Sequence, residues 1–197
     1  MWKRILLVAG LTALLFSWWS HRSVGREEGV LAPMAPAQMR LVGLRPFERG
    51  DYLLTPLARF DVEARVLGVK RYLLDREAAL APYDLALGWG RMSDSSILRD
   101  FEISQSNRFY HWTTKHPPIP HQEIVRSSAN MHIIPADDLV MSTLQRVRPG
   151  HLVSLKGYLV MAKAKDGFIW LSSTTRDDTG YGACEVVWVD TIAYRHE

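Results

Sequence analysis

The chain has 197 residues, which is enough for one domain preceded by a short anchor. Its hydrophobic fraction of 47% is normal for a globular protein with a real core, and its single cysteine excludes an internal disulfide. Three of the 24 basic residues and no acidic residue lie within 1–22, so residues 23–197 hold 21 basic and 21 acidic residues and lack the charge excess of a nucleic-acid-binding surface.

The first 22 residues predict a signal anchor that crosses the membrane once. Lys3 and Arg4 precede fifteen mostly apolar residues, 5–19, a layout typical of a secretory signal or a signal anchor. The bulky residues that follow disfavour cleavage of the N-terminal segment, although the sequence does not decide whether it is removed. Trp18 and Trp19 suit the membrane–water boundary. At about 1.5 Å per residue the run covers roughly 22 Å of a core about 30 Å thick, so flanking residues must snorkel. The basic start predicts that the N-terminus lies inside and the body outside the cytoplasm, which in a bacterium means a single-pass inner-membrane protein with its body in the periplasm.

Residues 23–51 indicate a flexible linker, and residues 52–197 a single mainly-β globular domain. The stretch 30–38 holds two prolines and little periodicity. Apolar and charged residues alternate cleanly over 59–66, which predicts a half-buried strand. Residues 75–82 predict a short helical turn.

A bend and a short helix are expected next. Gly88 and Gly90 flank Trp89, so the backbone can turn around this large ring. Asp94, or the serine before it, would cap a short helix over 95–101.

A strand, a loop and the clearest helix of the chain follow. Residues 108–112 predict a strand, and three prolines within 113–122 predict a loop. Residues 134–149 predict a helix: Pro135 suits its first turn, and acidic residues lie at the positive end of its dipole.

The C-terminal part predicts consecutive antiparallel strands. Apolar residues alternate over 153–161, with Gly157 in phase as a predicted bulge. The pair Asp166-Gly167 predicts a tight turn, and 183–189 predicts the last strand. The pattern as a whole predicts an α+β, mainly β fold, either a small bent sheet or an OB-like partial barrel with one or two short helices, behind the N-terminal transmembrane helix.

Cys184 is the first candidate for chemistry. One interpretation pairs it with His132 as activating base and with Asp94 or Asp178 as orienting acid. The other treats it as a small apolar residue of a strand, because its neighbours are apolar and no helix N-terminus follows that would activate a thiol. The sequence favours the second interpretation.

A set of polar and aromatic residues predicts a binding site. Ser128, Asn130 and His132 alternate, so in an extended segment their side chains project together. The alternative is that they satisfy neighbouring backbone groups. Tryptophan and tyrosine side chains would suit a sugar or another ring, although such residues more often fill cores. The predicted ligand-binding residues are Trp89, Asp94, Ser128, Asn130, His132, Arg176 and Asp178.

No cofactor and no metal is predicted. His111, His116 and His121 are spaced by five, which matches no helical face, and no cysteine or carboxylate stands at a recognisable ligand spacing. The motifs of phosphate-binding loops, dinucleotide-binding turns and serine-hydrolase elbows do not occur.

Three segments together resemble the signature of a family of bacterial proteins with an N-terminal membrane anchor. They are D-L-A-L-G-W-G-R-M-S-D (84–94), S-A-N-M-H-I-I-P (128–135) and S-S-T-T-R-D-D-T-G-Y-G-A-C-E (172–185). The resemblance covers about residues 52–194 and implies no assigned reaction. Separately, residues 147–160 and the strands after them resemble part of an OB-type barrel.

These observations predict a membrane-anchored cell-envelope protein with a non-catalytic binding or assembly domain facing the periplasm. Its expected contacts are the membrane, through residues 5–19, and an envelope protein or glycan, but no nucleic acid. Two alternatives stay open: a Cys184- and His132-dependent hydrolase or acyltransferase acting on envelope material, and a structural subunit of a membrane complex. The sequence does not decide whether the protein is an enzyme, and it leans against one.

Overall fold

The computed structural model describes residues 22–175, 180 and 182–195. The predicted anchor, residues 5–19, lies outside these residues, and within them no helix is long and apolar enough to cross a membrane. In the described part of the chain, eight strands form one mixed sheet and two more form a separate hairpin. The prediction of a mainly β fold is confirmed, but the described residues form three short α-helices and two 3₁₀-helices where the sequence predicts one or two short helices.

The strands are β1 (Ala37–Arg40), β2 (Phe47–Arg49), β3 (Tyr52–Arg71), β4 (Tyr83–Gly88), β5 (Glu102–Ser106), β6 (Phe109–Thr113), β7 (Ser128–Pro135), β8 (Leu152–Ala164), β9 (Ile169–Leu171) and β10 (Glu185–Arg195). The short helical elements are η1 (Arg76–Ala79), η2 (Gly90–Ser93), α2 (Ser95–Leu98), α3 (His121–Arg126) and α4 (Asp138–Leu144).

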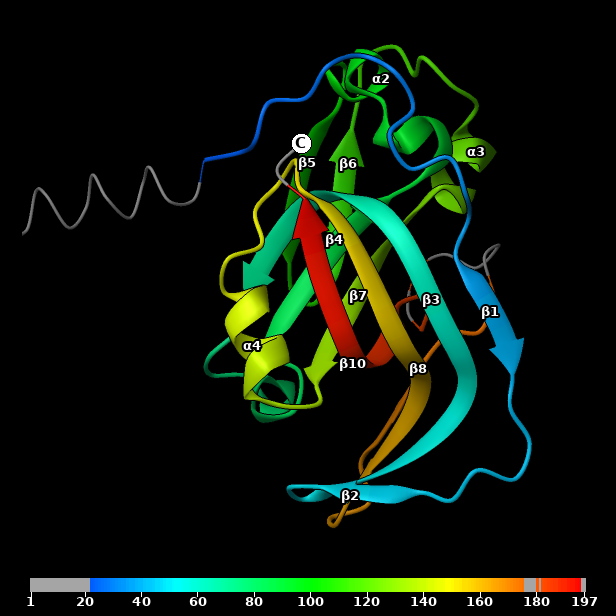
Figure 1. Cartoon of the computed structure of the whole chain (residues 1–197), viewed down its shortest axis with the longest axis vertical. Helices are drawn as coiled ribbons and strands as arrows, with labels where there is room; N and C mark the ends of the chain where they lie inside the picture. The colour runs from blue at the N-terminus through cyan, green and yellow to red at the C-terminus, as the bar shows by residue number, and fades with distance from the viewer. Residues whose placement is uncertain (1–21, 176–179, 181, 196–197) are drawn as a thin grey trace, which may run out of the picture.

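Five strands of the described residues close into a ring (Figure 1). β3 pairs with β4, β4 with β7, β7 with β10, β10 with β8, and β8 again with β3. The β7–β10 pair is parallel and the other pairs of the ring are antiparallel. β3 and β8 curve strongly and extend together beyond the ring to the end where β2 lies.

Two hydrophobic clusters lie on opposite sides of the ring strands. Successive side chains of a strand point to opposite faces. β7 therefore places Met131 and Ile133 in the inner cluster and Ile134 in the outer one. β10 does the same with Val187 on the inside and Val186 on the outside. Both faces of these strands are covered, which is why β4 is buried along its whole length.

The predicted helix over 134–149 is wrong at both ends, because α4 is shorter. Ile134 and Pro135 belong to β7, where they pair with Trp188 and Val189 in the parallel ladder. The helix starts only after Asp137, whose Oδ1 accepts a hydrogen bond of 2.8 Å from the amide of Val140. Pairing with β10 keeps the chain extended through Pro135, the residue that the sequence predicts in the first turn of the helix.

The bulge predicted at Gly157 lies instead in the partner strand. The register between β8 and β10 shifts between Val189 and Thr191, directly beyond the pair of Val189 with Gly157. A Cβ at Gly157 would lie 1.8 Å from the carbonyl oxygen of Trp188. The glycine therefore permits a close approach of two backbones rather than an extra residue.

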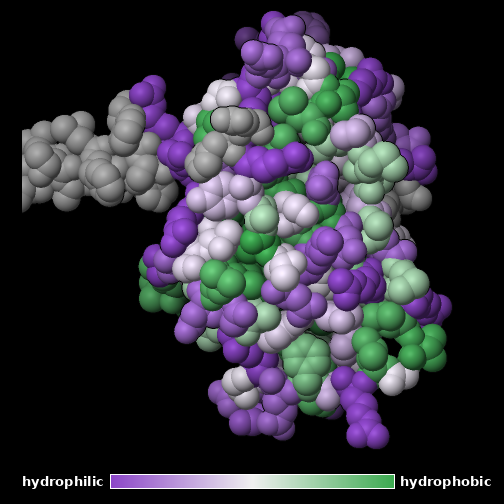
Figure 2. All heavy atoms as spheres, in the orientation of Figure 1, coloured by the Kyte–Doolittle hydropathy of each residue, from purple (hydrophilic) through white to green (hydrophobic). Residues whose placement is uncertain are grey.

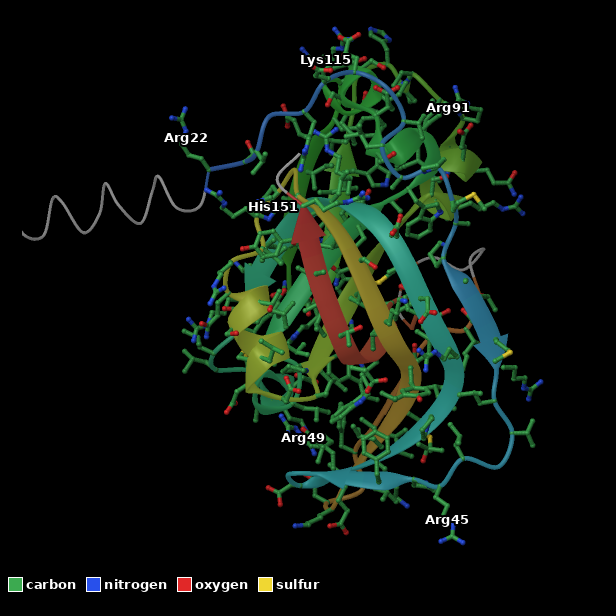
Figure 3. All side chains as sticks on the ribbon, viewed as in Figure 1. Arg22, Arg45, Arg49, Arg91, Lys115 and His151 are labelled. Carbon is green, nitrogen blue, oxygen red and sulfur yellow. The ribbon has the colours of Figure 1, made fainter. Side chains whose placement is uncertain are left out.

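The segment predicted as a flexible linker is attached to the body at several points. β1 and β2 both pair with β3. Before them, the amide of Val24 donates to the carbonyl of Pro149, and the carbonyl of Ala32 accepts from the amide of Gly90, each at 2.8 Å. The prolines leave this segment without periodicity, but its backbone groups still find partners on the body. Figure 3 shows His151 near the end of the ring that this segment crosses.

The face drawn in Figure 2 is mainly polar, with apolar side chains in separate patches. One patch lies over the segment between β1 and β2, where Val42 is 92% and Leu44 is 47% exposed. In Figure 3 the labelled basic side chains Arg22, Arg45 and Lys115 lie at different ends of the molecule.

Candidate functional site

The β5–β6 hairpin lies beside β7 and carries one wall of the site. Its tip is a tight turn, since Ser106 pairs with Phe109 and both residues between them have positive φ, 51° at Asn107 and 69° at Arg108. Such angles are typical of a type I′ turn, where asparagine is well tolerated. An arginine there is strained by about 1–3 kcal/mol, so other contacts must hold the tip in place.

The side chain of Arg108 supplies those contacts. It donates to the Asp84 carboxylate at 2.9 Å, to the carbonyl of Ala81 at 2.8 Å and to both oxygens of Asp75 at 2.9 and 2.6 Å. Its guanidinium carbon lies 3.8 Å from the ring centroid of Tyr72. Burial lowers the pKa of Arg108, but Asp75 and Asp84 outweigh burial and raise this pKa above its ordinary value.

Asp84 of β4 is fully buried and accepts hydrogen bonds from three side chains. Besides Arg108, the donors are Nδ1 of His132 at 2.8 Å and Nδ2 of Asn130 at 3.2 Å. Because a carboxylate only accepts, His132 holds its proton on Nδ1, and its ring centroid lies 4.6 Å from that of Trp170. The buried charge of Asp84 is therefore compensated by an ion pair and two further hydrogen bonds.

The other polar side chains of β7 are also hydrogen-bonded within the protein. Oδ1 of Asn130 accepts from Gln105 at 2.8 Å, and its Nδ2 also donates to the carbonyl of Arg108 at 3.0 Å. The hydroxyl of Ser128 donates to the carbonyl of Ile124 at 2.7 Å and accepts from Tyr110 at 3.1 Å. These bonds fasten the hairpin to β7 along its length.

A pocket of about 200 Å³ opens between the hairpin, β7 and the start of β10. Three aromatic residues of β6 contribute to its wall, and Ala183, Cys184 and Glu185 line it as well. The described lining residues are Phe109, Tyr110, Trp112, Val125, Ser128, Ala129, Asn130, Thr175, Gly180, Ala183, Cys184 and Glu185.

Cys184 lines this pocket and is half-buried, so it does not fill the core as the sequence favours. Its Sγ lies 3.8 Å from the carbonyl oxygen of Arg108. Within the described residues, the hydrogen bond of His132 goes to Asp84 and not to Cys184. The two residues predicted as nucleophile and base thus have different partners.

The structure brings together part of the predicted binding set. Ser128, Asn130 and His132 follow one another on the outer side of β7, as their alternation predicts. Trp89 is only 2% exposed and belongs to the inner hydrophobic cluster. Asp94 accepts from the amides of Ser96 and Gly29, which makes it a cap that also holds the N-terminal segment. The remaining two, at positions 176 and 178, lie outside the described residues.

Replacing Asp94 by alanine is expected to lower the free energy of unfolding by about 1 kcal/mol at neutral pH. The Gly29 amide, followed by the Ser96 amide, holds the pKa of Asp94 below its ordinary value of 3.8. A depressed pKa stabilises the folded state fully above pH 3.8, and this contribution is lost as the pH falls below it. Urea unfolding at about pH 7 and about pH 3 measures the difference, which must shrink at the lower pH; a constant difference would contradict the capping role.

Tyr110 is expected to stay protonated where exposed tyrosines ionise. Burial raises its pKa to about 12, although the hydrogen bond with Ser128 opposes the shift. A raised pKa means that stability is fully present below the ordinary tyrosine value of 10.0 and is lost as the pH rises through about 12. The ultraviolet tyrosinate signal of Tyr110→Phe should match that of the parent protein up to about pH 11. A smaller signal in the variant would show that Tyr110 ionises normally.

Two residues of the site, Asp84 and Arg108, were not predicted. Asp84 lies in the otherwise mostly apolar stretch 83–88, and a carboxylate buried there needs a partner. This requirement could have identified Asp84 from the sequence. Nothing in the sequence indicates that its partner is the residue at a hairpin tip 24 positions away.

Within the described part of the chain, no group of three or more histidine, cysteine, aspartate or glutamate side chains could hold a metal ion. Comparisons of the sequence with protein-family models and with curated proteins, and of the fold with solved structures, found no match.

Proposed function

We propose that this chain is a membrane-anchored envelope protein whose domain binds a ligand, without catalysis, in the pocket between β6, β7 and β10. The observation that carries the proposal is the pocket itself, of about 200 Å³, with three aromatic side chains on a wall that the Arg108 network holds in place. Concave, partly apolar sites with fixed walls are where proteins bind small groups, because little order is lost on binding.

The connectivity of the ring supports a finer fold assignment, an OB-type barrel. Its five strands include one parallel pair, β7 with β10, and the chain passes through α4 between the third and fourth strands, β7 and β8. Barrels of this type bind ligands on the outer face of their second and third strands. In this chain these are β4 and β7, and of these two strands β7 contributes to the lining of the pocket.

The hydrogen bonds of the site support binding rather than catalysis. A general base must reach the proton that it abstracts. His132 is 2% exposed and hydrogen-bonded to a carboxylate that also neutralises Arg108. A buried histidine held in this way suits a structural role better than proton transfer to or from a substrate.

One observation favours the enzyme as a second candidate. Cys184 lines the pocket, and the Asp84–His132 pair lies on strands of the same sheet. A hydrolase or acyltransferase would need Nε2 of His132 to approach the thiol, and it would leave a covalent intermediate on Cys184.

Native mass spectrometry of the full-length protein in detergent, mixed with small molecules extracted from bacterial envelopes, tests both candidates. We expect a non-covalent adduct with the parent protein. Ala183→Leu, which enlarges a residue that lines the pocket, should lose the adduct, whereas the matched control Ala183→Ser should keep it. An adduct covalently attached to Cys184 would establish the enzyme instead. Equal binding to the leucine variant, or no adduct at all, would overturn the pocket as the site.

A further inference from the structure

We propose that the end of the domain around the close of α4 lies on the lipid bilayer that holds the anchor, with Arg146 and Arg148 against anionic lipid head groups. The proposal rests on the membrane anchor of the proposed function. It adds a contact between the body of the protein and the membrane, and this contact gives the domain one orientation at the membrane surface.

The first described residues attach the chain to this end of the ring. The amide of Val24 donates to the carbonyl of Pro149, five residues after α4, at 2.8 Å. The side chain of Arg26 donates to the carbonyl of Gly150 at 2.8 Å and to that of Arg195 at 2.7 Å. Figure 1 shows that the described chain starts on the side of the molecule where α4 lies. The point at which the chain leaves the body is therefore fixed.

The attachment continues along the N-terminal segment, so the domain cannot swing freely on it. The hydroxyl of Ser93 is fully buried and accepts bonds of 3.0 Å from the amides of Leu31 and Ala32. Asp94 accepts a bond of 2.9 Å from the amide of Gly29. Releasing the segment would leave buried acceptors without partners, which is costly.

The length of the connecting chain limits the distance between this end and the membrane. Five residue steps separate Trp19, at the end of the predicted anchor, from Val24. Five steps span at most about 18 Å. The lipid head groups occupy roughly 6 Å of that span. Val24 therefore lies within roughly 12 Å of the head groups, which is comparable with the Debye length of about 8 Å at physiological salt.

Two arginines at the end of α4 carry the charge that suits anionic lipids. Arg146 is exposed and Arg148 is half-buried. Within the described part of the chain, neither arginine makes an ion pair. Asp137 and Asp138 lie at the start of α4, roughly 10 Å before its end. This asymmetry favours an orientation in which the basic end of the helix is nearer to the lipid than the acidic end.

Acidic side chains near this end reduce its positive charge but do not cancel it. They are Glu27, Glu28 and Glu63. Glu28 pairs with Arg99 at 2.7 Å, and Glu63 lies 4.0 Å from Arg195. Two of the three are thus matched by other arginines, so the charges of the two arginines after α4 exceed the single charge of Glu27.

The test measures how close two positions of the body come to the lipid. A fluorescent label is attached to Gln145→Cys, beside the arginines, or to Lys163→Cys, in full-length protein that also carries Cys184→Ser. Both labelled positions are exposed. Lys163 is separated from Leu152, at the start of β8, by about 36 Å of strand. The protein is placed in vesicles of phosphatidylcholine alone or mixed with phosphatidylglycerol, with a nitroxide quencher on the head groups.

We expect strong quenching at position 145 and little at position 163, and only in the vesicles with phosphatidylglycerol. Arg146→Gln/Arg148→Gln should lower the ratio of membrane-bound to released domain by about fivefold for each arginine. The matched control Arg40→Gln/Arg45→Gln removes the same charge elsewhere and should leave the quenching unchanged; Figure 3 shows Arg45 at a different end of the molecule from Arg22. Salt of about 1 M, where the Debye length is about 3 Å, should release the domain.

The outcomes separate this proposal from the proposed function. Equal quenching at position 145 in neutral and anionic vesicles, or an equal loss in the two double variants, would overturn the contact with anionic lipid while leaving the protein anchored. Extraction of the protein from the vesicles by alkaline carbonate would overturn the anchor itself. The lipid and salt comparisons use the parent charges, so they decide the matter even if a double variant fails to fold.

Discussion

Replacing Arg108 by methionine is expected to lower the free energy of unfolding by about 3–5 kcal/mol. The substitution leaves the fully buried carboxylate of Asp84 without its cationic partner. It also removes the side-chain contacts that hold the strained hairpin tip in place. Denaturant unfolding followed by tryptophan fluorescence measures the loss. Binding in the pocket should weaken as well, since the hairpin supplies the aromatic wall.

The matched control is Asp75→Asn, which changes the other carboxylate bonded to Arg108. The Asp75 side chain is 33% exposed, so water can replace much of its interaction. Partly exposed ion pairs contribute only about 0–1 kcal/mol, and the control should stay within that range. If Arg108→Met proved as mild as Asp75→Asn, the buried pair with Asp84 would not be what holds the hairpin.

Replacing Gly157 by alanine is expected to cost about 3 kcal/mol of stability, the upper end of the usual range for adding a group to a packed interior. The added Cβ would meet the carbonyl oxygen of Trp188 at 1.8 Å, and this oxygen belongs to the backbone of the paired strand β10. A rotamer change cannot relieve such a contact, so β8 and β10 must separate where the ring closes. The same denaturation measurement reports the effect.

Gly25→Ala provides the control for the change from glycine to alanine. No atom lies within 4 Å of the Cβ position at Gly25, and its φ is outside the left-handed region. This variant should change stability by less than about 1 kcal/mol. Near-parent stability of Gly157→Ala would show that the two strands are not packed as closely as the ring requires.

The sequence by itself determined the local features of the protein. Alternation over 59–66 predicts part of β3, and the Asp166-Gly167 pair predicts the turn before β9, where Gly167 has a φ of 93°. The spacing of Ser128, Asn130 and His132 predicts that they share one side of a strand. These predictions succeed because side-chain alternation and turn geometry depend on neighbouring residues only.

Only the tertiary structure decided which distant segments meet. Pairing with β10 keeps residues 134 and 135 extended, although their own sequence favours a helix start. The partner of Asp84 comes from a hairpin 24 positions away, and the pocket forms only once that hairpin lies against β7. Which strands pair and which charged groups pair depends on the whole fold, because the free energy of burying a sheet face or a carboxylate depends on the residues that cover it. The site therefore follows from the closing of the ring and from the position of the hairpin, which no local pattern encodes.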